Sequence, residues 1–350
     1  MWKDWKSRGA VSLTFLVALA LLALVSMASA AGASKRAQRD QVKVAFVTTQ
    51  KGGDHGVIDD MIRYFNKAKT DFNLNTKYIE ALDPSTYNQT LQSLCTAGYQ
   101  IIIGNFPGLQ KPIADIAPSC PQTKFIHIYG DPDKPAIANV QRIGYRYWDG
   151  EYLGGMFAAA ISQTHKIAYQ GGLETPAIAA DANAFARGAA KENKQVRVKM
   201  VISGSGFADP AKSHDAAAAL FAAGYDVVEA DDDGTGPIRA THETKNRYAL
   251  TGQAQDLVKN PKTVPAIIYI RFGKSLYDAL AAALKPGWHG GATVVGLKQG
   301  IVGLQISPFF KGPARVMAAI RGVKPMINLW SKKIANGTFV VPFDPKWRGA

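Results

Sequence analysis

The sequence has none of the short motifs that mark phosphate-binding, nucleophilic or zinc-dependent enzymes. It contains no Gly-x-x-x-x-Gly-Lys-Ser/Thr loop, no Gly-x-Ser-x-Gly turn and no His-Glu-x-x-His helix. The nearest phosphate-type stretch, residues 203–206, lacks the lysine that should follow it. The six histidines are scattered, with no pair at metal-ligand spacing. We therefore predict a protein that is not an enzyme and that has neither metal nor cofactor.

Cysteine is nearly absent, with only Cys95 and Cys120 in the chain. Cys95 ends a predicted helix, and Cys120 follows the next helix along. Successive right-handed crossovers place those two helices side by side on one face of a parallel sheet. No histidine or aspartate stands near enough in sequence to suggest a catalytic or metal role. We predict a structural disulfide between the two cysteines.

The chain has few acids for its many bases, but the bases are dispersed. Lysine and arginine exceed aspartate and glutamate to give a net charge of +14. Outside Lys35, Arg36 and Arg39, no basic cluster reaches the density typical of nucleic-acid binding. The excess positive charge suits solubility or attraction to an acidic partner or envelope surface. We predict no nucleic-acid partner.

Only one long apolar run is present, and it lies at the start of the chain. Lys3, Lys6 and Arg8 precede an apolar stretch over residues 11–27, and the small residues 28–30 have the Ala-x-Ala form of a cleavage site. A retained anchor is the alternative, although the run is at the short limit for spanning a bilayer. We predict a signal peptide over residues 1–30 and a mature periplasmic protein without a lipid anchor.

The remaining 320 residues alternate between apolar strand-like runs and helical patterns. This alternation is typical of parallel sheets covered by helices on both faces. The number of strands and a break near residues 142–155 predict two lobes, the first from residues 42–147 plus 268–325 and the second from residues 148–267 plus 326–345. The predicted strands are 43–48, 75–80, 100–104, 124–129, 166–170, 196–202, 226–229, 247–251, 266–270 and 293–297.

The first predicted strand runs into a glycine-rich turn that presents Asp54 and His55 just before a helix. Small ligands bind at this edge of parallel α/β sheets. A carboxylate there can accept hydrogen bonds from N–H or hydroxyl groups, although a helix cap would explain Asp54 equally well. Phe106 also follows a predicted strand, and it could either contact a ligand or fill the cleft.

Several motifs in order along the chain resemble the basic membrane protein (BMP) family of ABC-transporter substrate-binding proteins. They are Gly-Asp-His-Gly at 53–56, Tyr-Arg-Tyr-Trp-Asp-Gly-Glu-Tyr-Leu-Gly-Gly at 145–155, Asn-Ala-Phe-Ala-Arg-Gly-Ala at 183–189, Phe-Ala-Asp-Pro-Ala-Lys at 207–212 and Gly-Leu-Lys-Gln-Gly at 296–300. The resemblance implies a two-lobed type I periplasmic binding fold. It also implies a ligand between the lobes, characteristically a purine nucleoside or base, and a permease partner in the inner membrane.

The resemblance also assigns candidate ligand residues, with one departure. A proteobacterial branch of the family has a tryptophan after the Gly-Asp-His-Gly turn, where this chain has Val57. Phe207 and Phe272 correspond to two further aromatic positions, and Asp233 to the family's acidic position. The loss of one aromatic platform weakens the expectation of a purine, because stacking on a base contributes about 1–3 kcal/mol.

Two further polar residues are candidates for ligand contact. Asn183 lies in a predicted helix over residues 177–190, where it could face either ligand or solvent. Arg271 follows a predicted strand and could stack on a base, clamp a carboxylate or pair with an acid across the hinge.

The sequence thus predicts a monomeric solute-binding protein of an ABC importer that closes on a small planar solute. The alternatives are the same fold binding a sugar or an acidic solute, a sensor subunit, or a nucleoside hydrolase. A hydrolase would need clustered carboxylates for calcium, and the Asp231–Asp233 run lacks the ligand spacing of a calcium loop.

Overall fold

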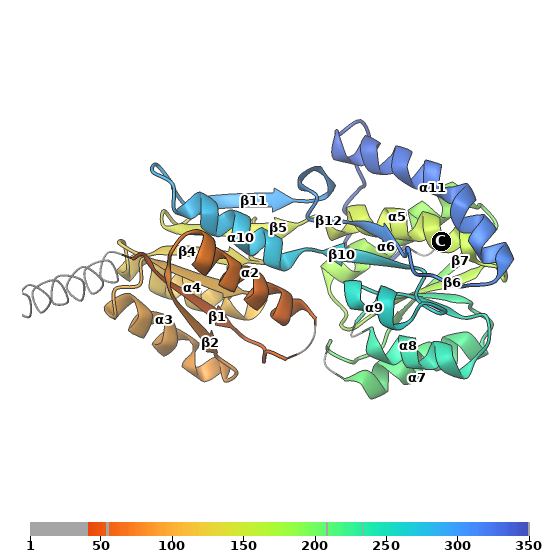
Figure 1. Ribbon diagram of the computed structural model, residues 1–350, viewed down its shortest axis with the longest axis horizontal. Coiled ribbons are helices and arrows are strands. Elements are labelled where there is room, and N and C mark those ends of the chain that lie inside the picture. The colour runs from red at the N-terminus through yellow and green to blue at the C-terminus, as the bar shows by residue number, and fades with distance from the viewer. Residues whose placement is uncertain (1–40, 54–55, 208, 233, 349–350) are drawn as a thin grey trace, which may run out of the picture.

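The computed structural model describes residues 41–53, 56–207, 209–232 and 234–348. The chain forms two lobes that lie side by side along the long axis of the molecule (Figure 1). Each lobe is built on a parallel sheet flanked by helices, so the predicted α/β class with two lobes is confirmed. The predicted signal peptide lies outside the described residues.

The first lobe contains a six-stranded parallel sheet in the order β11-β5-β4-β3-β1-β2. Its central strands are buried and apolar on both faces, as expected for a parallel sheet between two helical layers. One face packs against α2 and α10, and the other against α3 and α4. The elements are β1 (Lys43–Thr48), α2 (Val57–Asp71), β2 (Asn75–Glu80), α3 (Tyr87–Thr96), β3 (Ile101–Asn105), α4 (Gln110–Ile116), β4 (Lys124–Ile128), β5 (Val140–Tyr145), α10 (Phe272–Ala283) and β11 (Gly291–Val295).

The second lobe contains parallel strands in the order β7-β6-β8-β9, and β10 lies next to β9 through a bridge between Thr251 and Ile267. Strand β12 runs antiparallel to β10 and forms the edge. Helix α11 covers α5. The elements are α5 (Tyr147–Ile161), β6 (Lys166–Gly171), α6 (Pro176–Glu192), β7 (Arg197–Ile202), α7 (Pro210–Ala222), β8 (Val227–Asp231), α8 (Thr235–Glu243), β9 (Tyr248–Leu250), α9 (Ala254–Lys259), β10 (Ala266–Ile270), β12 (Val302–Ile306) and α11 (Ala314–Ala335).

The chain passes between the lobes three times. It crosses from β5 to α5 at Arg146, from β10 to α10 at Arg271, and from β11 to β12 through residues 296–301. The crossings are joined by backbone hydrogen bonds from the Arg146 amide to the Val295 carbonyl (2.9 Å) and from the Arg271 amide to the Ile301 carbonyl (2.8 Å). Three linked crossings make a hinge between the lobes.

The strand pairing corrects the predicted division of the chain. We assigned residues 268–325 to the first lobe, but the last crossing is complete by residue 301, because β12 pairs with β10 in the second sheet. Most of β10 also belongs to the second sheet, with the crossing at Arg271 instead of at residue 268. The sequence analysis missed β5 and β12, whose glycine and polar residues interrupt the apolar pattern.

Close packing of α5 on α6 explains the small residues at 154–155 and 188. A Cβ atom on Gly155 would lie 1.8 Å from the carbonyl oxygen of Phe185, and one on Gly188 would lie 1.9 Å from that of Tyr152. Both glycines therefore allow a backbone approach that a side chain would prevent. This pair of helices lies against one face of the second sheet and carries several polar residues of the candidate site.

The two cysteines are joined. Cys95 ends α3 and Cys120 precedes β4, with their Cα atoms 6.0 Å apart. The disulfide therefore ties the helical layer of α3 and α4 at the edge of the sheet opposite to the carboxyl ends of the strands.

Candidate functional site

Four aromatic side chains form a cluster at the carboxyl edge of the first sheet. Phe106 follows β3, Tyr129 follows β4, Tyr145 ends β5 and Phe272 begins α10 after the second crossing. The Tyr129 and Tyr145 rings are stacked with centroids 5.5 Å apart, and Phe272 meets Phe106 and Tyr129 edge-on, each at 5.8 Å. The Tyr145 hydroxyl is bound to Ser275 at 2.8 Å. We call these four residues the aromatic cluster.

Two members of the aromatic cluster have strained backbones. Phe106 has a φ of 64° and Tyr129 a φ of 62°, in a region that large L-residues rarely adopt. The Phe106 amide donates to the Ile128 carbonyl at 2.8 Å, and a ring nitrogen of buried His127 lies 2.8 Å from the Phe106 carbonyl oxygen. Burial lowers the pKa of His127 to about 4, so the ring is neutral at physiological pH. Strain of this kind at strand ends is typical of ligand sites.

The second lobe supplies carboxylates to the region facing the first. Glu229 and Asp231 are two residues apart in β8 and therefore share the sheet face that packs on α5 and α6. Asp181 comes from α6 and Glu151 from α5. Glu151 and Glu229 are fully buried, and Asp181 is 3% exposed. We call these four residues the acidic cluster.

Burial dominates the protonation of the acidic cluster. It raises the pKa of Asp231 to about 6, while the Tyr169 hydroxyl, which donates to this carboxylate, lowers it. Burial and the charges of neighbouring acids raise the pKa of Glu151 and Glu229 well above the usual value. No described residue donates a hydrogen bond to the Glu229 carboxylate. These carboxyls therefore retain protons at pH values where exposed acids have lost them.

Tyr129 in the aromatic cluster lies within reach of the charges of two acids in the second lobe. Burial raises the pKa of Tyr129, and the charges of Asp181 and Asp231 in the second lobe raise it further. Tyr147, at the start of α5, is buried beside the same acids and donates to the Ile268 carbonyl at 3.1 Å. The carboxyl edge of the first sheet thus supplies aromatic rings, and the second lobe supplies acids whose charges reach them.

The structure brings some of the predicted residues to this site. Phe106 and Phe272 belong to the aromatic cluster. Phe207 lies in the turn after β7, is 41% exposed and packs against Gly172, where a Cβ atom would be 3.2 Å from its ring. Val57 is half-buried at the first position of α2 and packs against the core of the first lobe. Asp54, His55 and Asp233 lie outside the described residues.

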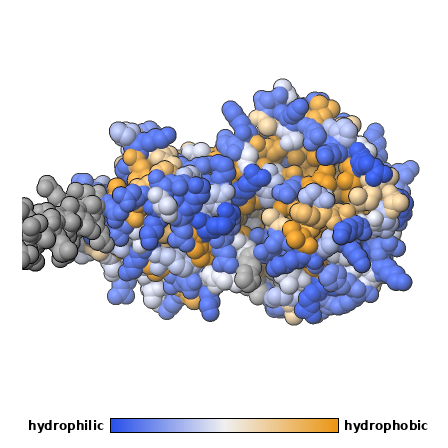
Figure 2. Space-filling model, in the orientation of Figure 1, coloured by the Kyte–Doolittle hydropathy of each residue, from blue (hydrophilic) through white to orange (hydrophobic). Residues whose placement is uncertain are grey.

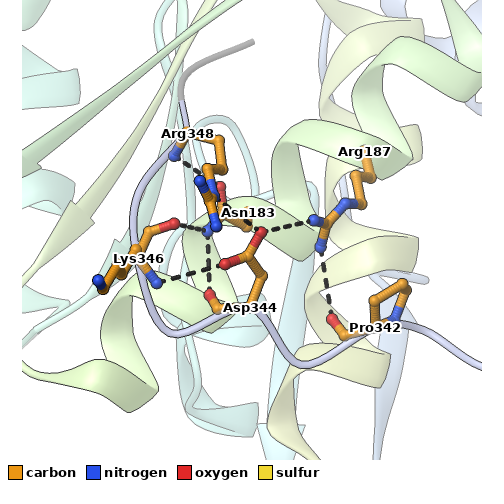
Figure 3. Close-up of polar contacts among 6 residues, drawn as sticks. All are labelled: Asn183, Arg187, Pro342, Asp344, Lys346 and Arg348. Carbon is orange, nitrogen blue, oxygen red and sulfur yellow. Dashed lines mark hydrogen bonds and ion pairs between the residues drawn. The ribbon is translucent and has the colours of Figure 1, made fainter.

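Asn183 is placed elsewhere, because its amide holds the C-terminal segment (Figure 3). It donates to the carbonyls of Asp344 (3.0 Å) and Lys346 (2.7 Å) and accepts from the Arg348 amide (3.1 Å). Arg187, one turn further along α6, pairs with the Asp344 carboxylate at 3.0 Å. The prediction of a ligand-facing amide is therefore wrong in this structure, because the Asn183 amide is hydrogen-bonded to the C-terminal segment.

Arg271 also points away from the two clusters. Its guanidinium lies 4.5 Å from the centroid of the Tyr269 ring, and it lines a groove between β12 and α11 on the second lobe. Although Phe272 enters the aromatic cluster, the preceding side chain leaves on the other side of the crossing strand. The predicted clamp on a ligand does not match this position.

The sequence analysis missed Tyr129, Asp181, Glu229 and Glu151. Glu229 had a detectable signal, since an acid in the middle of the strand Val-Val-Glu-Ala-Asp, between apolar residues, is costly to bury without a purpose. The sequence analysis considered Asp231 and Asp232 only as part of a run that lacks calcium-loop spacing. In the structure Asp231 accepts from Tyr169, and Asp232 accepts from the Gln170 amide at 2.7 Å.

Within the part of the chain that the structure describes, no three His, Cys, Asp or Glu side chains are arranged to hold a metal ion. In the same residues, no helix is long and apolar enough to cross a membrane.

Comparison with known proteins agrees with this architecture. The family model described as "ABC transporter substrate-binding protein PnrA-like" matches residues 41–341. A purine-binding protein of Brucella abortus is 27% identical over 279 residues, covering 78% of this chain and 77% of the relative. Basic membrane protein A1 of Borrelia garinii is 26% identical, covering 86% and 88%.

Among solved structures, an ABC-transporter solute-binding protein from Aeropyrum pernix superimposes with a TM-score of 0.72 at 18% identity, covering 87% of this chain and 94% of that chain. The fold is that of the solute-binding proteins. The chain belongs to the BMP family of ABC-transporter substrate-binding proteins, as the resemblance predicted. Membership implies a small-molecule ligand and a membrane permease as partner.

Proposed function

We propose that the protein is a periplasmic solute-binding component of an ABC importer. In this proposal it binds a purine nucleoside, nucleobase or similar small planar solute between its lobes. The observation that carries the proposal is an aromatic cluster at the ends of the strands beside the hinge, within reach of the charges of Asp181 and Asp231 in the second lobe. A planar base would lie against Phe106, Tyr129 and Phe272. The hydroxyl or N–H groups of the solute would donate to Asp231 and Asp181.

The ligand acts by favouring one arrangement of the lobes. A solute that touches both clusters binds more tightly when the lobes are closed, and it shifts the population toward that form by this difference in affinity. The permease then receives the closed, loaded protein. Export through a cleaved signal peptide, a periplasmic location and a monomeric state complete the proposal, and no covalent step is involved.

A sugar is the second candidate ligand. The half-buried Val57 in place of an aromatic residue and the row of carboxylate acceptors favour a solute with several hydroxyl groups. An acidic solute fits less well, because buried carboxylates face the site while Arg271 lies outside it.

Identification of the bound solute tests the proposal. Mass spectrometry of small molecules released from protein purified from its native periplasm should show a stoichiometric purine compound. Calorimetric titration of the refolded protein with adenosine, guanosine, inosine, ribose and glucose should then give binding by the same class, abolished by Asp231→Asn with Phe106→Ala. Binding of glucose alone would replace the purine by the sugar, and binding that survives the double substitution would reject the site.

A further inference from the structure

Strand β12 is an open edge of the second sheet. It pairs only with β10 among the described strands. The Ser307 amide donates to the Pro265 carbonyl (2.9 Å), and the Arg271 amide to the Ile301 carbonyl (2.8 Å), so hydrogen-bonded pairs bracket the ladder. In an antiparallel ladder, hydrogen-bonded pairs of opposed residues alternate with pairs that are not hydrogen-bonded. Leu304 and its partner Ile268 therefore form a pair that is not hydrogen-bonded. The Ile268 amide opposite it indeed donates away from β12, to Thr251.

The alternation turns the backbone N–H and C=O groups of Leu304 and Ile306 outward. No hydrogen bond joins them to another described residue. Unpaired groups along an edge strand form a template onto which another extended chain can add as a strand.

A groove runs beside this edge. It has a volume of about 450 Å³ and lies between β12 and α11. Figure 2 shows a broad hydrophobic area on this face of the second lobe. The groove is lined by Tyr269, Arg271, Leu304, Gln305, Ile306, Ser307, Pro308, Lys324, Ile327 and Asn328. Its side chains are thus apolar or neutral apart from two cations.

The charges in and near the groove indicate which kind of partner it would bind. Arg271 and Lys324 form no ion pair with a described acid. From residue 279 to residue 343 the chain has eight lysines and arginines and not one aspartate or glutamate. The segment that supplies β12 and α11 is therefore positive, and together with the two cations in the groove it favours an anionic partner over a neutral or basic one.

We propose that the groove between β12 and α11 binds an acidic segment of a partner protein in extended conformation. The segment adds as a strand to the outer edge of β12, through the backbone groups of Leu304 and Ile306. The side chains on one face of the segment enter the groove, and the carboxylates among them reach Lys324 and Arg271. A concave groove beside a strand edge suits an inserted chain better than a flat lipid surface. The site is separate from the two clusters, and the proposal stands whichever solute the protein binds.

Fluorescence anisotropy tests this proposal with a labelled peptide of the repeat Val-Thr-Glu-Thr, in which valine and glutamate share one strand face. The peptide should bind, more weakly as salt is raised, while the same peptide with lysine in place of glutamate should not. Lys324→Glu should weaken binding roughly tenfold, since it turns an attraction into a repulsion. Lys332→Glu is the matched control, because it makes the same charge change on the same helix outside the groove and should leave affinity within about twofold.

A second peptide separates strand addition from simple charge attraction. Methylation of alternate backbone nitrogens on the edge that pairs with β12 should abolish binding. Equal binding of the methylated peptide, or equal affinity of Lys324→Glu and Lys332→Glu, would overturn the proposal. Self-association through the groove, detected by sedimentation, would also overturn the proposal. The same holds if Lys324→Glu releases the protein from vesicles of anionic phospholipid without affecting peptide binding. Unchanged thermal midpoints show that the variants are folded.

Discussion

At the scale of single residues, Phe106 shows how the site is held ready. Its backbone has a positive φ, and a hydrogen bond from its amide to the Ile128 carbonyl holds it in that conformation. The strain costs of order 1–3 kcal/mol, and the surrounding sheet offsets this cost before any ligand arrives. The ring is therefore presented in one orientation beside Phe272, so little freedom is lost on binding.

Replacement of the Phe106 ring should weaken ligand binding. Phe106→Ala removes a stacking surface, and we expect affinity to fall roughly tenfold to a hundredfold, corresponding to about 1–3 kcal/mol. Phe309→Ala serves as control, since Phe309 is also a half-exposed ring but lies beyond β12. Titration calorimetry with the identified solute measures both. Equal affinities would remove Phe106 from the site.

Glu229 makes stability depend on pH in a direction opposite to that of a surface acid. Its pKa is raised by burial, so the folded protein keeps a proton that the unfolded chain loses above its usual pKa near 4.5. The folded state binds more protons in that range, and its contribution to stability falls as pH rises.

Glu229→Gln should therefore stabilise the protein at pH 7.5 by about 1–3 kcal/mol and have little effect near pH 4. Denaturant unfolding at the two pH values measures the difference. The exposed Glu174→Gln is the control and should show no such pH dependence. A gain from Glu229→Gln that is equal at both pH values would mean that the carboxyl is not protonated in the folded state.

At the scale of elements, the contact of α5 with α6 is set by two glycines. Gly155→Ala would place a methyl group against the Phe185 carbonyl, and the helices would have to move apart. We expect a loss of about 1–3 kcal/mol or more. Gly322→Ala in α11 is the matched control: nothing lies within 4 Å of its Cβ position, so the better helix former should raise stability by up to about 1 kcal/mol. Thermal unfolding measures both variants. Midpoints that shift in the same direction for the two variants would contradict this explanation.

The elements also show what a sequence can predict. Strands such as β1 were found because four of its six residues are buried and apolar, whereas β5 and β12 contain Gln, Arg or Gly and were missed. The strand-end rule located Phe106, and the family resemblance located Phe272. Neither gives side-chain direction, and for that reason Arg271 and Asn183 stayed candidates for ligand contact. Tyr129 was counted as the last residue of its strand and not considered further.

At the scale of the whole molecule, the three crossings allow the lobes to move as rigid bodies. Saturating solute should lower the radius of gyration measured by small-angle X-ray scattering, because it bridges the two clusters. Asp231→Asn with Phe106→Ala should remain at the unbound value under the same conditions. A radius that does not change although calorimetry shows the site to be full would mean that binding occurs without closure.

The same three crossings constrain the order in which the protein can fold. The first sheet is not complete until β11 at residues 291–295 joins β5, and α10 must cover its face beside α2. Neither lobe is a continuous stretch of chain, so neither can finish folding until its last strand has joined its sheet. Contacts of such long sequence separation form slowly. The apolar faces of β1, β3 and β4 therefore stay exposed until residues far along the chain arrive to cover them.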